Sequence, residues 1–311
     1  MPHLCGKHRR PARLALAAGR LYALRMIIRK HPSGLVLLYA LRGSVLPVIA
    51  PRLGLVRVIS LGAIEVHHLA PVYFTAINPA PFTLLGLGLS IFLGFRNNAC
   101  YARWWEGRQQ WGALVAQSRA LLRDIVTLLP GTAGLHHQMA DHVTGFAQAL
   151  RDELRDNARN GATRPSARLR QLAADLAAAR ADGTLSDILL TSFIARLDAM
   201  TGIQAACERL RNTPMPFAYS LMLHRTVWLF CLLVPFGIVG TLDWATPVLT
   251  MALAYAFFSL DALGEELEAP FNPSPNGLPL NALVRVIEIA AAEALGDEPP
   301  PPLAPAGFVL L

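Results

Sequence analysis

The stretch from Asn78 to Trp105 decides the fold, and it reads N-P-A-P-F-T-L-L-G-L-G-L-S-I-F-L-G-F-R-N-N-A-C-Y-A-R-W-W. No aspartate, glutamate, lysine or arginine occurs from Val66 through Phe95, and Arg96 follows at once. The two prolines near the start suit the first turn of a helix, whose backbone N–H groups lack partners in any case. Together with its neighbours, the apolar run is long enough to be one half of a membrane hairpin.

The helix predicted from this stretch carries two neighbouring stripes. One consists of small residues four apart, which allow transmembrane helices to approach closely, namely Gly86, Ser90 and Gly94. The other consists of bulky apolar residues at the same spacing, about 100° further round the helix, namely Leu87, Ile91 and Phe95. Such a pair of stripes suits a helix that packs on copies of itself with its bulky side toward a shared axis. Spacing alone favours the plainer interpretation, in which the bulky stripe faces lipid or a core.

The composition is that of an integral membrane protein with one sizeable soluble part. The chain has 311 residues, of which 53% are hydrophobic and only 16% are charged, and its mean hydropathy is +0.39. A soluble domain normally carries about 25% charged residues. The net charge of +7 comes from arginines that are spread along the chain beside apolar runs, which indicates orientation in a membrane rather than binding of nucleic acid.

Sites for metals, cofactors and covalent chemistry are not indicated. The four cysteines form neither a C-x-x-C pair nor a zinc spacing, and the two histidine groups lack cysteine or carboxylate partners at ligand spacing. No Walker loop, dinucleotide fingerprint, H-E-x-x-H motif or nucleophile elbow occurs. We therefore predict no metal site, no cofactor and no enzymatic activity.

Four predicted spans give one consistent topology, at about residues 53–68, 79–95, 224–242 and 244–263. The short loops 69–78 and 240–247 hold no lysine or arginine, whereas arginines follow the second span. Basic residues favour the cytoplasmic side. We therefore expect a multi-pass protein with both termini and a helical domain, residues 97–223, inside, and two short loops outside.

Helical patterns fill the soluble domain, and no strand pattern of useful length occurs, so the chain reads as all-α. The helices are expected at 101–129, 136–157, 168–181 and 187–210, the last with Ser186 or Thr184 as its N-cap. A final amphipathic helix is expected at 280–295. The basic residues 1–25 are expected to be disordered or non-native, with Met26 as a start, and the proline-rich residues 296–311 to be disordered.

Acidic residues cluster at the end of the fourth span. Asp261 lies inside the span and is a functional candidate by its position, although a nearby arginine would also account for it. Glu265, Glu266 and Glu268 could supply oxygen ligands to calcium. Pairing with arginines of the helical domain is the interpretation that we favour.

Several long motifs resemble the bacterial bestrophin-like proteins. The second span ends I-F-L-G-F-R-N at Asn97, and Y-A-R-W-W-E-G-R-Q-Q-W-G follows from Tyr101. T-P-M-P-F-A-Y begins at Thr213, and G-E-E-L-E-A-P-F-N begins at Gly264. The start M-I-I-R and the segment R-G-S-V-L at 42–46 also fit, so the resemblance covers residues 26–295, called here the channel domain.

The resemblance implies a homopentameric channel for monovalent ions in the bacterial plasma (inner) membrane. The family's apolar neck, three residues at four-residue spacing, falls on Leu87, Ile91 and Phe95, which changes the preferred interpretation of that stripe from packing to pore. The family's cytoplasmic aperture falls on Ile188. Animal members are calcium-activated chloride channels, whereas bacterial relatives can favour cations. The aspartate run of the animal calcium site is absent, because residues 273–277 read P-S-P-N-G.

Two other classes of function remain open on the sequence. A secondary transporter would normally show internal repeats and broken helices, and neither is evident. A non-conducting membrane scaffold that recruits a partner through the helical domain fits the sequence as well. Selectivity is also open, because Glu65 and Asp243 on the outer side would attract cations and the arginines of the inner side would attract anions.

Overall fold

The computed structural model describes residues 26–27, 44–72, 77–131, 133–157, 163–274, 276–304 and 309–310. The extension predicted for residues 1–25 lies outside this part of the chain. Within it, the secondary structure is helical except for one short pair of strands, β1 (Met26–Ile27) and β2 (Val309–Leu310), which pair antiparallel. The expected all-α architecture is confirmed, and a short segment predicted to be disordered, Val309–Leu310, forms a strand.

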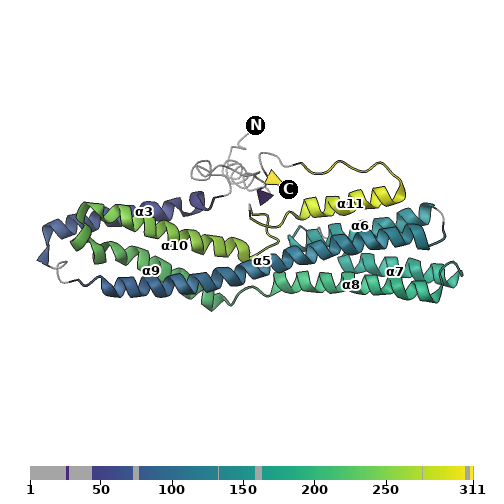
Figure 1. Ribbon diagram of the computed structural model, residues 1–311, viewed down its shortest axis with the longest axis horizontal. Helices are drawn as coiled ribbons and strands as arrows, with labels where there is room; N and C mark the ends of the chain where they lie inside the picture. Colours follow the sequence, from purple (N-terminus) through teal and green to yellow (C-terminus); the bar gives the residue numbers. More distant parts are fainter. Residues whose placement is uncertain are drawn as a thin grey trace, which may run out of the picture.

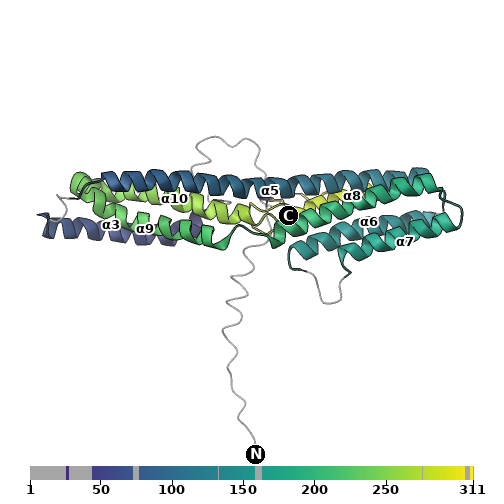
Figure 2. The same cartoon turned by 90° about the horizontal axis from the view of Figure 1, so that it is seen from below.

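The molecule is an elongated helical rod with two halves (Figure 1). One half holds α3 (Leu46–Leu69), α9 (Phe217–Leu242), the short 3-10 helix η2 (Asp243–Ala245) and α10 (Thr246–Glu268). The other half holds α6 (Ala133–Leu154), α7 (Pro165–Ala181), α8 (Asp187–Asn212) and α11 (Leu280–Leu295). Helix α5 (Ala80–Leu128) runs through both halves, and Figure 2 shows it along almost the whole length of the molecule.

The structure corrects the prediction of a span at 79–95 followed by a separate helix from Tyr101, because α5 includes both. It is continuous over 49 residues, which at 1.5 Å per residue is about 74 Å. No glycine or proline interrupts residues 95–105, and Arg96 is buried rather than placed at a helix end. The sequence placed the change from membrane to cytoplasm at Arg96, whereas the helix continues without a break through this residue.

Helix α3 begins at Leu46, before the expected position near Leu53. Pro47 lies in the first turn, where the missing N–H would have no partner in any case. Two helical segments of the described chain are long and apolar enough to cross a membrane, α3 and the α9–α10 hairpin, residues 217–268. The apolar arm of α5 is shorter, since only 16 residues, from Ala80 to Phe95, precede Arg96 in this helix.

Each half has its own core of apolar side chains. In the membrane half, α3, α5, α9 and α10 contribute large buried residues that include Ile49, Leu93, Val227 and Phe258. In the second half, α5 packs with α6, α8 and α11, and α7 covers α6 and α8; Trp111 is fully buried there. The predicted N-cap of α8 is confirmed at Ser186, whose hydroxyl accepts a hydrogen bond from the backbone N–H of Leu189.

Candidate functional site

The three residues of the predicted neck lie on an uncovered face of α5. The exposed fractions of Leu87, Ile91 and Phe95 are 61%, 49% and 62%. Between them, Leu89 and Leu93 are buried against the other helices of the membrane half. Since no described element of the chain covers the stripe, its apolar surface is left for lipid or for further copies of the chain.

The small residues of the neighbouring stripe have different environments. Gly86 faces the ring of Phe230 on α9, and a Cβ atom at this position would lie 2.9 Å from the ring. Ser90 and Gly94 are exposed, and the Ser90 hydroxyl donates to the Gly86 carbonyl at 2.8 Å. Gly86 is therefore needed within a single chain. A role for Ser90 and Gly94 in packing at a pore stays a prediction.

Ile188 lies in the first turn of α8, with 84% of its surface exposed. The neighbouring Asp187 carboxylate accepts from Arg180 Nε at 2.7 Å. Helix α8, whose first turn holds Ile188, packs on α5 and lies in the half of the rod away from α3, α9 and α10 (Figures 1 and 2). An aperture at Ile188 stays a prediction.

A buried charge cluster joins the four membrane helices. The Asp261 side chain on α10 is fully buried, and Arg96 Nη1 on α5 donates to its Oδ1 at 2.7 Å. Arg52 Nη1 on α3 lies 3.4 Å from Oδ2, and His224 Nδ1 on α9 lies 2.8 Å from the same oxygen. The expectation that an arginine accounts for Asp261 is confirmed.

The hydrogen bonds assign the proton of His224. The Trp228 indole N–H can only donate, and it lies 3.1 Å from His224 Nε2. Nε2 is therefore the acceptor, and Nδ1–H donates to Asp261. The histidine is neutral in this arrangement.

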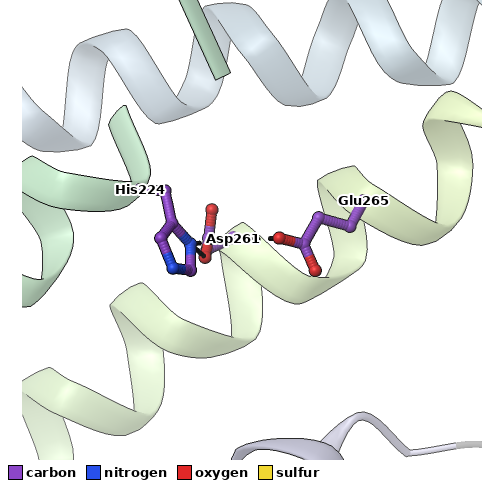
Figure 3. A group of neighbouring side chains, drawn as sticks. All are labelled: His224, Asp261 and Glu265. Carbon is purple, nitrogen blue, oxygen red and sulfur yellow. Dashed lines mark hydrogen bonds and ion pairs between the residues drawn. The ribbon is translucent and has the colours of Figure 1, made fainter. Parts of the chain in front are cut away.

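The group His224, Asp261 and Glu265 has the side chains of a metal site (Figure 3). One ligand atom from each lies within 4.8 Å of the others. A cation bound at Nδ1 of His224 would shift the proton to Nε2, where it would face the N–H of Trp228. Two guanidinium groups also already compensate Asp261. The geometry therefore favours a structural hydrogen-bond network over a cation site.

The three glutamates after Asp261 have unlike partners, which corrects the expected pairing with arginines. Glu268 lies 3.8 Å from Arg96 Nη2, and its Oε1 accepts from a backbone N–H. Glu266 accepts from the Asn276 side chain. Glu265 lies 3.9 Å from His224. Of the three, only Glu268 contacts an arginine within the described residues.

Comparison with known proteins decides the family. The family model described as "Bacterial/Fungal Bestrophin protein" matches residues 26–293. The chain belongs to the bacterial and fungal bestrophin family.

Individual relatives agree with this assignment. A voltage-dependent anion channel-forming protein of Mesorhizobium japonicum is 40% identical over 291 residues, which cover 88% of this chain and 94% of that protein. A protein of Escherichia coli K12 with the same description is 40% identical over 285 residues, which cover 85% and 92%. The crystal structure of a bacterial bestrophin homologue from Klebsiella pneumoniae superposes with a TM-score of 0.76 at 35% identity and covers 81% of this chain and 100% of that one. This bestrophin is thus an all-α membrane channel protein and not an enzyme.

Sequence reasoning missed two members of the buried charge cluster in this bestrophin, Arg52 and His224. The available signal was that each lies near the inner end of a predicted span, at the depth of Arg96 and Asp261. His224 is also four residues before Trp228, which places both side chains on one face of α9. No pattern along the chain indicated which arginine pairs with Asp261.

Proposed function

We propose that this bestrophin forms a homopentameric, passive channel for monovalent anions in the bacterial plasma membrane, with a neck of Leu87, Ile91 and Phe95 and an aperture at Ile188. The observation that carries the proposal is the exposure of these three neck residues in line on α5, on the side of the helix opposite to the buried Leu89 and Leu93. A soluble surface would not keep three large apolar residues in line, and lipid alone would not require their alignment with small residues.

The neck works as a hydrophobic constriction. Rings of apolar side chains resist the passage of ions because a narrow apolar pore dewets, and small rotations of the helices can widen it. Ser90 and Gly94 are exposed beside the neck, which suits the close approach of five helices to one axis.

The curated relatives described above, which are named for anion channels, support anions as the permeant species. The positive-inside pattern supports a topology with both termini and residues 97–223 in the cytoplasm. Residues 26–295 form the channel domain in this proposal.

The decisive experiment is reconstitution of the purified chain in planar bilayers and liposomes. Replacement of Leu87, Ile91 and Phe95 by alanine is expected to raise the conductance severalfold, since it widens the neck and lowers its apolar barrier. The matched control replaces Leu85 and Phe92, which are also exposed but lie on another side of α5, and it should leave the conductance unchanged.

The same preparation separates the rival functions. Unaltered current through the triple alanine variant would refute the neck. Absence of any ion flux would favour a scaffold, and flux that depends on a coupled substrate gradient would favour a transporter. Light scattering should give five times the chain mass of 33.7 kDa. In a salt gradient, the reversal potential should lie closer to the equilibrium potential of the anion than to that of the cation.

A further inference from the structure

The uncovered face of α5 continues far below the neck. Eighteen residues make five full helical turns, so residues 18 and 36 positions apart share one angular position. Each neck residue has successors at these positions: Trp105 and Arg123 below Leu87, Gln109 and Thr127 below Ile91, and Ala113 below Phe95. All of these successors are exposed.

The other faces of α5 are covered over the same length. Trp111, Leu114, Leu121 and Ile125 are fully buried in the core of the second half, where α6, α8 and α11 pack on α5. The face of α5 that carries the neck residues is therefore free in both halves of the molecule. If the neck residues face a shared axis, the successors face the same axis.

The chemistry of this face changes along the helix. It is bulky and apolar at the neck, and it is basic near the end of the helix, at Arg119 and Arg123. Arg123, with 65% of its side chain exposed, donates to Asp124 Oδ1 at 2.8 Å, and Arg196 Nε donates to the other carboxylate oxygen at 2.6 Å. One carboxylate thus serves two guanidinium groups and leaves one positive charge in surplus.

Arg119 adds a second surplus charge. It is exposed one turn before Arg123, and it has no ion pair within the part of the chain that the structure describes. The two arginines lie close to the predicted aperture. Arg123 and Arg196 share the carboxylate of Asp124, and Arg196 follows Ile188 by eight residues on α8, or about 12 Å along the helix axis. Asp187, beside Ile188, is already compensated by Arg180.

We propose that Arg119 and Arg123 of the assembled copies form a basic belt inside the cytoplasmic aperture, which concentrates monovalent anions and sets the preference for anions over cations. The inference rests on the proposed function and names the residues that select charge. A ring of like charges in a protein-walled vestibule raises the local concentration of counter-ions. The effect depends on salt, since the screening length falls from about 30 Å at 0.01 M to about 3 Å at 1 M.

The test is the anion-to-cation permeability ratio of the Arg119→Gln, Arg123→Gln double variant, taken from reversal potentials in KCl gradients. We expect the ratio to fall about threefold or more in gradients near 0.01 M and to change little near 1 M, where salt screens the belt. The control is Arg170→Gln. Arg170 is exposed on α7, which packs on α6 and α8 and lies away from α5 in Figure 2.

Three outcomes would overturn the proposal. They are an unchanged ratio at low salt, an equal change in Arg170→Gln, and loss of the oligomer in Arg119→Gln alone, which would make Arg119 a contact between copies. The charge-keeping variant Arg119→Lys, Arg123→Lys should retain the ratio. The neck is tested independently. If the belt proposal alone fails, the triple alanine variant should still show a higher conductance than the wild type.

Discussion

Replacement of Asp261 by asparagine tests how the membrane half is held together. The substitution keeps the volume of the side chain and removes the only carboxylate that the described part of the chain places within 3.5 Å of the Arg96 guanidinium. Arg96 is 2% exposed, so it cannot reach water without local unfolding. Breaking a buried ion pair by the loss of one partner costs about 3–5 kcal/mol, because an uncompensated charge remains.

The assay is thermal unfolding of the purified oligomer in detergent, followed by tryptophan fluorescence or by loss of the size-exclusion peak. The expected loss of stability corresponds to a fall in Tm of about 5–10 °C. Asp243→Asn is the control. Asp243 contacts His68 at 2.8 Å, but half of its side chain is exposed, and an exposed pair is worth about 0–1 kcal/mol.

A second substitution separates charge from packing. Arg96→Met combined with Asp261→Asn removes the buried cation together with its partner, and apolar replacements of buried pairs are often neutral. The double variant should therefore recover most of the lost stability. The reasoning would be refuted if Asp261→Asn alone had the same Tm as the wild type, or if the double variant had a lower Tm than the single variant.

Three further predictions concern packing and titration. Gly237→Ala should lower the free energy of unfolding by about 1–3 kcal/mol, because the added Cβ would lie 2.5 Å from the Phe82 ring. Thermal unfolding measures this loss, and an unchanged Tm would contradict the predicted clash. Burial raises the pKa of the Cys207 thiol to about 12, so maleimide at pH 8 should label Cys207 only after unfolding, and rapid labelling of the native protein would contradict this. The backbone carbonyl of Ala133 and the Asp297 carboxylate raise the pKa of His137 above 6.5. The contacts of protonated His137 therefore stabilise the folded state fully below pH 6.5, and this stabilisation is lost as the pH rises through the raised pKa. Histidine NMR titration should show that pKa fall toward 6.5 in Asp297→Asn, and no change would contradict the assigned contact.

Much of the fold could be predicted from local patterns. The helices at 187–210 and 280–295 lie within two residues of α8 and α11, because apolar periodicity and capping residues act over a few neighbours. Helix α3 was predicted too short, since its prolines and arginines weaken the apolar signal without stopping the helix. The residues of the neck could be named only through family resemblance, because a stripe at four-residue spacing has the same pattern whether it faces lipid, a core or a pore.

The amino-acid sequence by itself determined that this protein is helical, crosses a membrane and belongs with the bestrophins, since hydropathy, charge placement and long motifs are properties of neighbouring residues. Only the tertiary structure decided that α5 passes unbroken through Arg96, because the carboxylate that compensates this charge is 165 residues away in the chain. It also decided which face of α5 remains uncovered, from Leu87 to Arg123. Exposure depends on which helices pack against a surface, and that choice depends on contacts between distant segments rather than on the helix alone.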